Sequence, residues 1–213
     1  IDIKNDGSFQ LNMDYFDYCT GLKMINKRFE KLFGGPARKP ESKITQRDMD
    51  LAASIQKITE EVVIKLSTNI QKQTKQKNLC LAGGVALNCV ANSALLKKEI
   101  FEKIWIQPAS GDAGGALGAA LSVYYSMFNK PRLKLETDKM NGSYLGPKYK
   151  SEDIYKDLKK LKSNFIEHRP ETIITKIAKS LSEGKAIGWM QGRMEFGPRA
   201  LGNRSIIADP RSP

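Results

Sequence analysis

The sequence predicts an α/β protein, and three observations lead to this fold class. Short apolar runs typical of strands alternate along the chain with longer stretches of helical periodicity. Two predicted strands run into glycine-rich turns that precede helices, at Gly83-Gly84 and at Gly114-Gly115. A third predicted strand ends in a loop that is rich in arginine and glycine, residues 191–205. Strands and helices that alternate in this way are typical of layered α/β domains.

Composition narrows the functional classes. The chain has 213 residues, 40% hydrophobic and 27% charged, which is room for one large or two modest folded domains. No apolar run is long enough to cross a membrane, and no signal peptide is visible. The net charge of +12 comes mostly from scattered lysines without interleaved aromatic residues, so we interpret it as a solvated surface. Three cysteines without CxxC spacing indicate a reducing, cytoplasmic location.

The first quarter of the chain contains one strand signal and two helix signals. Residues 8–13 alternate polar and apolar and predict a half-buried strand. Residues 15–33 predict a helix that ends at a Gly-Gly-Pro stop. Thr45 and Asp48 have the spacing of a capping box, which predicts the start of a long helix that fades near residue 72. The expected buried stripe of this helix is Leu51, Ile55, Ile58, Val62, Leu66 and Ile70.

Alternating strands and helices follow. We expect a strand at 78–82, a helix at 86–101, a strand at 103–108 and a helix at 116–128. Residues 133–150 have no clear periodicity and are interpreted as a linker. A second unit follows, with the predicted order helix (151–161), strand (165–166), helix (171–182) and strand (186–190). The predicted division is therefore a first domain over 1–132, a linker over 133–150 and a second domain over 151–213.

The two glycine turns are candidate nucleotide sites. At Gly83 and Gly84 the missing side chains let a ligand approach the backbone, and Asn88 is within reach to bond a ribose or base. A tight turn needed only for packing is the alternative. Asp112 and Gly114 follow the end of the next strand, where open α/β sheets bind ligands. The Asp112 carboxylate suits a metal ion or a substrate hydroxyl, and an N-cap role is the alternative.

The loop over residues 191–205 is the strongest candidate site. Arg193, Arg199 and Arg204 carry planar guanidinium groups suited to phosphate or carboxylate, while three glycines and Pro198 shape the backbone. We interpret the loop as an anion site, most simply for a phosphate. The alternative is that the arginines pair with acidic groups across a domain interface. His168, the single histidine, has no second ligand at metal-binding spacing and is interpreted as a surface residue.

Three segments together resemble the NodU/CmcH-type O-carbamoyltransferases: residues 81–88, residues 108–114 and, most specifically, residues 192–205. The resemblance implies a fold of two domains. Residues 1–132 would be the C-terminal half of an actin/Hsp70/sugar-kinase-like (ribonuclease H-like) domain. Residues 151–213 would be the start of a YrdC-like domain.

The resemblance also implies an activity. In that family carbamoyl phosphate and ATP form carbamoyl-adenylate in the second domain, and the carbamoyl group passes to a substrate hydroxyl in the first, where Fe²⁺ is bound. Carried over to this chain, the metal ligand is Asp112 and the catalytic residues are Arg199 and Arg204. The nucleotide-contacting and carbamoyl phosphate-contacting residues are Gly83, Gly84, Asn88, Gly114, Arg193, Glu195, Asn203 and Ser205.

One departure from the family is visible, because the His-x-x-x-His metal pair does not occur in this chain. We expect a fragment that is inactive alone and binds iron weakly. The expected partner is a small-molecule hydroxyl acceptor, with no membrane and no nucleic acid, and a homodimer is left open. Two other functions remain as alternatives: an ATP-dependent kinase or ATPase of the actin-like superfamily, and a non-catalytic basic RNA-binding module.

Overall fold

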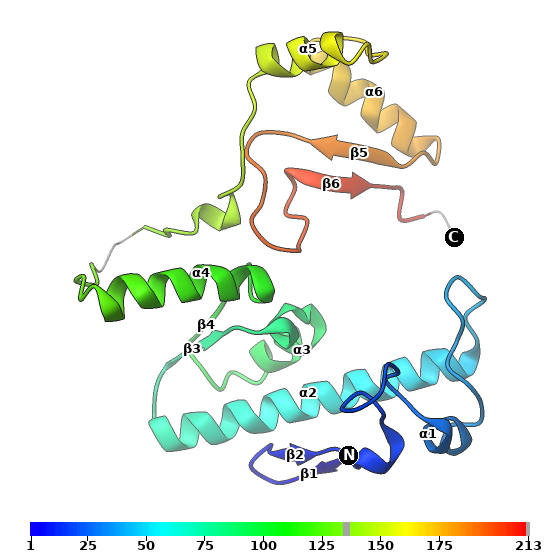
Figure 1. Ribbon diagram of the computed structural model, residues 1–213, viewed down its shortest axis with the longest axis vertical. Helices are drawn as coiled ribbons and strands as arrows, with labels where there is room; N and C mark the ends of the chain where they lie inside the picture. Colours follow the sequence, from blue (N-terminus) through cyan, green and yellow to red (C-terminus); the bar gives the residue numbers. More distant parts are fainter. Residues whose placement is uncertain (134–136, 212–213) are drawn as a thin grey trace. The chain divides into compact units, whose positions relative to one another are not determined.

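The computed structural model describes residues 1–133 and 137–211. Helices and short strands alternate along these residues in a mixed α/β arrangement, consistent with the predicted class (Figure 1). The strands are β1 (Asp2–Ile3), β2 (Phe9–Gln10), β3 (Asn78–Leu81), β4 (Lys103–Ile106), β5 (Ile187–Met190) and β6 (Arg204–Ile207). The α-helices are α1 (Lys27–Leu32), α2 (Gln46–Thr74), α3 (Cys89–Leu96), α4 (Asp112–Ser122), α5 (Ser151–Lys160) and α6 (Pro170–Ser182).

The described strands form three separate two-stranded sheets, in the orders β1-β2, β3-β4 and β5-β6. The chain divides into two compact units. Unit 1 contains Ile1–Leu81 and Asn88–Trp105, and unit 2 contains Ala82–Leu87 and Ile106–Pro213. The division into an actin-like domain, a linker and a YrdC-like domain stays a prediction. Residues 134–136 of the predicted linker and residues 212–213 lie outside the described part of the chain.

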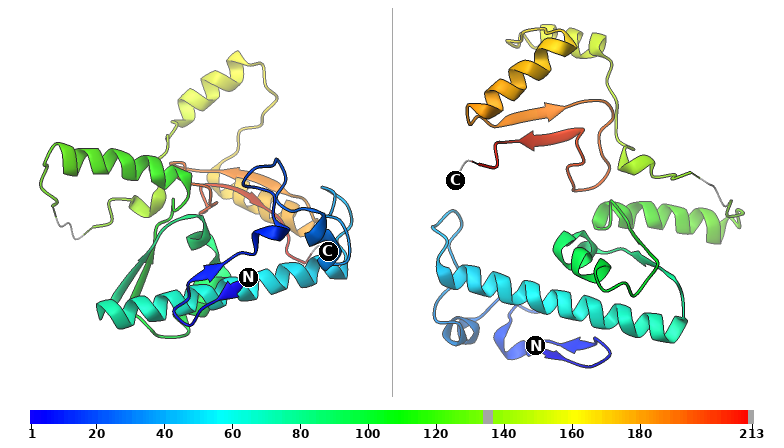
Figure 2. Two further views of the ribbon diagram at one scale, coloured as in Figure 1. Left: turned by 60° about the horizontal axis from the view of Figure 1, so that its bottom comes forward. Right: turned by 180° about the vertical axis from the view of Figure 1, so that it is seen from behind.

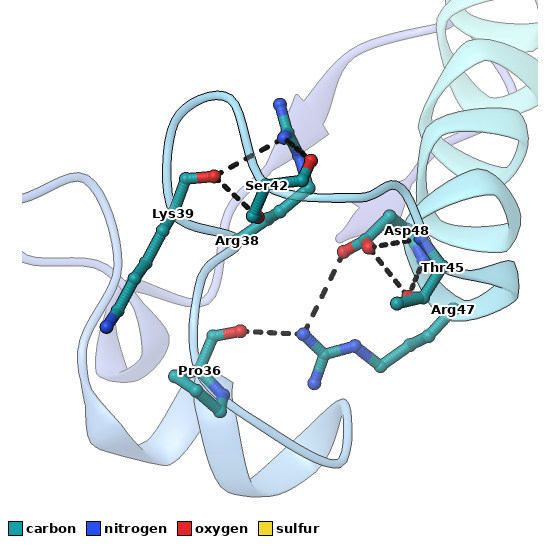
Figure 3. Close-up of polar contacts among 7 residues, drawn as sticks. All are labelled: Pro36, Arg38, Lys39, Ser42, Thr45, Arg47 and Asp48. Atoms are coloured by element: carbon teal, nitrogen blue, oxygen red, sulfur yellow. Dashed lines mark hydrogen bonds and ion pairs between the residues drawn. The ribbon is translucent and has the colours of Figure 1, made fainter.

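Helix α2, with 29 residues, is the longest helix of unit 1, and its N-terminus has the predicted capping box. The Thr45 N–H donates to Asp48 Oδ2 at 2.9 Å, and the Asp48 N–H donates to Thr45 Oγ1 at 3.4 Å. The Thr45 hydroxyl also donates to the carboxylate, and these bonds lower the pKa of Asp48. Next to the cap, Arg47 donates to the carbonyl of Pro36 at 2.6 Å and so fixes the preceding loop (Figure 3). The cap prediction is confirmed.

Helix α3 packs on α2 in unit 1 (Figure 2). It supplies most of the buried apolar side chains of this unit. Ala91 and Leu95 are 1% and 0% exposed, and Phe101 is also buried. The stripe predicted on α2 is only partly covered in the described structure, since Ile55 remains 52% exposed. The 8 residues of α3 span about 12 Å and the 29 residues of α2 roughly 44 Å, so α3 alone cannot cover the stripe along its whole length.

Three predicted elements differ from the structure. The half-buried strand expected over 8–13 is reduced to β2, whose two residues are both exposed. The helix expected over 15–33 is confined to α1, because the Asn26 side chain accepts hydrogen bonds from Arg28 N and Phe29 N and sets the start of the helix there. The strand expected at 165–166 is absent from the described residues. Phe165 instead packs edge-on against Tyr155 of α5, with ring centroids 5.6 Å apart, so this segment packs on a helix rather than beside a strand.

Unit 2 has its buried centre in loops rather than in a sheet. Strands β5 and β6 pair antiparallel, with Gly188 opposite Ile206 and Met190 opposite Arg204, and α6 packs on β5 (Figure 1). The buried residues of this unit include Ala109, Ser110, Ser143 and Glu195, and these lie in or beside the loop that joins β5 to β6. Among the residues that the structure describes, no helix is long and apolar enough to cross a membrane.

Candidate functional site

Glu195 organises the loop between β5 and β6. Its side chain is only 6% exposed, and its Oε1 atom accepts three backbone hydrogen bonds. The donors are the N–H groups of Leu201 at 3.0 Å, Asn203 at 2.8 Å and Arg204 at 3.2 Å. One carboxylate oxygen therefore fixes the backbone of the whole turn from residue 201 to residue 204.

The charge of Glu195 is stabilised by the same bonds. Burial acts to raise the pKa of this carboxyl, but the backbone N–H groups of Asn203, Glu195 itself, Leu201 and Arg204 outweigh burial and lower the pKa to about 2. Glu195 is therefore ionised at neutral pH. The contact of Glu195 with a cofactor remains a prediction. In the structure the side chain accepts the backbone hydrogen bonds that hold the turn over residues 201–204.

The loop also closes on itself through Asn203 and Gln191. The Asn203 side-chain amide donates to the carbonyl of Arg193 at 2.7 Å. Gln191 donates from its backbone N–H to Asn203 O at 2.9 Å and from its side chain to Gly202 O at 3.1 Å. These bonds join the two ends of the loop and hold Arg193 and Arg204 in a fixed backbone frame.

Residues 143–147 form a wall beside the loop. Ser143 is fully buried, and its hydroxyl donates to the carbonyl oxygen of Phe196. The backbone N–H of Phe196 donates in turn to Ser143 O at 2.7 Å. The Tyr144 hydroxyl donates to Leu201 O at 2.8 Å, and the Gly146 N–H donates to Met194 O at 2.9 Å. Sequence reasoning did not find Ser143 or Gly146, since their partners are main-chain groups about 50 residues later, which carry no sequence signal.

The three predicted arginines bond to carbonyls or face solvent. Arg193 Nη1 donates to Gly146 O at 2.7 Å, and Arg199 Nη2 donates to Leu87 O at 2.7 Å. Arg204 is exposed and lines a shallow, mainly apolar hollow of about 720 Å³ on the β5–β6 hairpin. None of the three forms an ion pair with a described acidic residue. The described structure thus gives no support to the alternative of arginine–carboxylate pairing.

The arginine loop meets both glycine turns within unit 2. Gly197 has φ of +119°, and a Cβ built there would lie 3.1 Å from Ala109 Cα. The Gly83 N–H donates to Ser110 O at 2.7 Å, and Arg199 bonds to the carbonyl of Leu87. Residues predicted for two separate centres therefore belong to one compact unit: Gly83, Gly84, Asp112, Gly114, Arg193, Glu195, Arg199, Asn203, Arg204 and Ser205.

The turn before α4 explains Gly114 and defines the position of Asp112. A Cβ at Gly114 would overlap the carbonyl oxygen of Ala109, so close backbone packing requires glycine there. Asp112 is the first residue of α4 and is exposed, while the N-cap is Gly111 without a side-chain bond. The N-cap alternative for Asp112 is wrong. A carboxylate in the first turn still interacts favourably with the helix dipole.

Asn88 belongs to unit 1 and has a structural role there. Its Oδ1 accepts from Ala91 N at 3.0 Å and caps α3. Its amide also pairs with Gln56 of α2, donating to Gln56 Oε1 at 2.8 Å and accepting from Nε2 at 3.3 Å. Sequence reasoning missed Gln56, because a pair separated by 32 residues leaves no periodic signal. The ribose contact predicted for Asn88 stays a prediction.

The residues present do not by themselves fit a metal centre. Over residues 1–133 and 137–211, no three or more His, Cys, Asp or Glu side chains are grouped to hold an ion. Asp112 is thus part of no such group among the described residues, whereas protein sites for transition metals usually combine several ligands. No chemical step is assigned to iron in this chain.

Residues 1–121 match the family model described as carbamoyltransferase N-terminus, and residues 178–213 match the one described as carbamoyltransferase C-terminus. The chain is 54% identical to the uncharacterized protein sll1178 of Synechocystis over 100% of its length, which is 35% of that protein. It is 42% identical to the nodulation protein NolO of Bradyrhizobium diazoefficiens over 78% of its length, 30% of that protein.

A third relative is nodulation protein U of Rhizobium tropici, which is 35% identical over 64% of this chain and 21% of that protein. The chain therefore spans about a third or less of the length of these curated relatives. The two matched regions include both glycine turns and the whole arginine loop.

Proposed function

Because the chain belongs to the carbamoyltransferase family, we propose that it is part of an enzyme that makes carbamoyl-adenylate from carbamoyl phosphate and ATP and transfers the carbamoyl group to a hydroxyl. The acceptor would be a small molecule or a sugar. The observation that carries the proposal is the arginine loop, whose three guanidinium groups have no described acidic partner and lie in the unit that contains both glycine turns.

The loop has the electrostatic character that two phosphate-bearing substrates require. Each guanidinium has five N–H donors, and Arg193 and Arg199 each use one of them on a carbonyl. That single bond restrains the side chain, which lowers the entropy lost when a ligand binds. Their other donors make no hydrogen bond within the described residues and suit the paired oxygens of a phosphate.

In the proposed reaction water displaces phosphate from carbamoyl phosphate to give carbamate. A carbamate oxygen then forms a bond to the α-phosphorus of ATP and pyrophosphate leaves, while Arg199 and Arg204 stabilise the negative charge that builds up. The acceptor hydroxyl attacks the carbamoyl carbon and releases its proton to solvent; a new C–O bond forms while the bond to the AMP oxygen breaks, and AMP leaves with that electron pair. Arg193, Glu195, Asn203 and Ser205 belong to the binding loop in this proposal.

The glycine turns are proposed to hold the nucleotide. Gly83 and Gly84 present no side chain to an approaching phosphate, and a Cβ at either would meet open space. Asn88 keeps one amide hydrogen without a described partner, which is available to a ribose or base. We also propose that the parent fold combines an actin-like and a YrdC-like domain, and that Asp112 contributes to an iron site when further ligands are supplied.

The test is ligand binding to the full chain. At about ten times Kd, carbamoyl phosphate should add about 1.4 kcal/mol to the stability of the binding unit. For a chain of this size that raises Tm by roughly 3–6 °C. Arg193→Ala and Arg204→Ala should abolish the shift. Arg28→Ala removes an exposed arginine from unit 1 and should leave the shift unchanged.

Two outcomes would favour another function, and a third would contradict the expected inactivity of this chain. A shift with ATP but none with carbamoyl phosphate, together with phosphorylation of an acceptor, would favour a kinase. Salt-dependent RNA retention without either shift would favour an RNA-binding module. Turnover of carbamoyl phosphate by this chain alone would contradict the expectation that it is inactive.

A further inference from the structure

The backbone N–H groups of the arginine loop converge on a carboxylate that belongs to the chain itself. Successive N–H groups arranged around a concavity are a common way for proteins to bind phosphate. Here the three N–H groups at Leu201, Asn203 and Arg204 are occupied by Glu195 Oε1, at 3.0, 2.8 and 3.2 Å. The loop therefore carries a built-in anion where a phosphate would otherwise bind.

We propose that Glu195 is a positioning residue that holds the turn over residues 201–204 and thereby presents Arg193 and Arg204 to the substrate phosphate. The inference rests on the proposed function, which supplies the phosphate ligand. It assigns Glu195 no contact with that ligand. This differs from the family resemblance, from which we expected Glu195 to touch the cofactor directly.

Burial and charge both favour the positioning role. Glu195 is 6% exposed, so little of the side chain is accessible to a ligand. A carboxylate facing a phosphate would repel it, because like charges at short range weaken binding. The negative charge of the carboxylate is instead stabilised by backbone N–H dipoles, and no described arginine pairs with it. The arginines therefore keep their full charge for the substrate.

The geometry connects Glu195 to two of the three arginines. Arg204 N is itself one of the donors to Oε1, so the carboxylate fixes the start of β6. Asn203 N is another donor, and the Asn203 side chain bonds to Arg193 O at 2.7 Å. Loss of the carboxylate should thus disturb the backbone of both Arg193 and Arg204.

The experiment compares Glu195→Gln and Glu195→Ala with Glu183→Gln in the full chain. Glu183 carries the same charge on the surface of unit 2, where it pairs with Lys185 at 2.8 Å. Two quantities are measured: the Kd for carbamoyl phosphate by calorimetry, with inorganic phosphate as a second probe, and hydrogen exchange at the backbone amides of residues 201, 203 and 204. Exchange in α2 reports whether unit 1 stays folded.

We expect Glu195→Gln to weaken carbamoyl phosphate binding about tenfold and to speed exchange at the three amides by at least as much. Glu195→Ala should lose binding, and Glu183→Gln should change neither quantity. The Gln variant keeps the size of the side chain, so it remains informative if the Ala variant unfolds.

Three results would overturn the proposal. Tighter binding in Glu195→Gln would mean that the carboxylate faces the ligand and repels it. Unchanged affinity with faster exchange would mean that the turn does not present the arginines. Unchanged exchange would mean that Glu195 does not hold the turn. Absence of binding by the unsubstituted chain would instead overturn the proposed function, while the exchange rates would still decide whether Glu195 anchors the loop.

Discussion

Replacing Gly197 with alanine is expected to separate the arginine loop from residues 108–109. Gly197 has φ of +119°, a conformation that L-residues rarely adopt, so a side chain there costs roughly 1–2 kcal/mol. Its Cβ would also lie 3.1 Å from both Cα and Cβ of Ala109, which is 0% exposed. Overpacking of this kind costs typically 1–3 kcal/mol. The sum predicts that unit 2 loses roughly 2–5 kcal/mol.

Gly202→Ala provides the matched control for this prediction. Gly202 lies in the same loop with φ of +105°, but a Cβ there would meet nothing within 4 Å. The control should therefore incur only the backbone cost of about 1–2 kcal/mol. The difference between the two variants isolates the contact with Ala109.

The assay is urea unfolding followed by tryptophan fluorescence. Trp189 lies in β5 of unit 2, and a Trp105→Phe background removes the tryptophan of unit 1. The Gly197→Ala midpoint should fall further than the Gly202→Ala midpoint, with faster exchange at the amides around Ala109. Equal losses in the two variants would refute the reasoning, because the contact would then contribute nothing.

Three further predictions follow from the described contacts. Ser143→Ala removes the bond from the buried Ser143 hydroxyl to the carbonyl of Phe196 and should cost roughly 1–3 kcal/mol in urea unfolding, because this part-buried carbonyl loses its donor. Thr45→Ala removes the cap of α2 and should cost about 1 kcal/mol, seen as an earlier loss of helical circular dichroism on heating. The pKa of Glu195 is lowered from 4.5 to about 2. Its stabilising contribution is therefore present above pH 4.5 and lost as pH falls through 2. In Glu195→Gln the free energy of unfolding should therefore decrease less steeply as the pH is lowered over this range.

Each of the three has a simple control. Ser163→Ala changes an exposed serine shortly after α5 and should leave the stability of unit 2 unchanged; an equally small effect of Ser143→Ala would contradict the first prediction. Thr45→Ser retains a hydroxyl and should restore most of the helix stability. A Glu195→Gln chain with the same acid unfolding curve as the unsubstituted chain would disprove the titration argument.

Several helices and strands could be predicted from sequence signals that lie within the element itself. The Thr45–Asp48 box and the helix that follows depend on residues within one turn, and both are present as predicted. Strands β3, β4 and β5 also follow from compact apolar runs. The resemblance to the carbamoyltransferases, which depended most on residues 192–205, is confirmed by the family matches.

The interior of the site could not be predicted in the same way. The resemblance implied that Glu195 touches a cofactor, and this stays a prediction. Its internal role could not be foreseen, because its main-chain donors at 201, 203 and 204 leave no pattern in the sequence. The bond from Arg199 to Leu87 O spans 112 residues and depends on a carbonyl that every residue type possesses. The failed helix over 15–33 has a local cause, since Asn26 accepts the first N–H bonds of α1 and starts the helix late.

Most side-chain bonds that hold the arginine loop end on main-chain atoms, and this has a consequence for mutational tolerance. Arg199, Arg193 and Tyr144 bond to the carbonyls of Leu87, Gly146 and Leu201. Leu87 and Leu201 contribute to these bonds through groups that any replacement retains. A saturation library of the loop and its wall should therefore be asymmetric: substitutions at the side-chain donors are damaging, while those at Leu87 and Leu201 leave the bonds intact as long as the backbone path is kept.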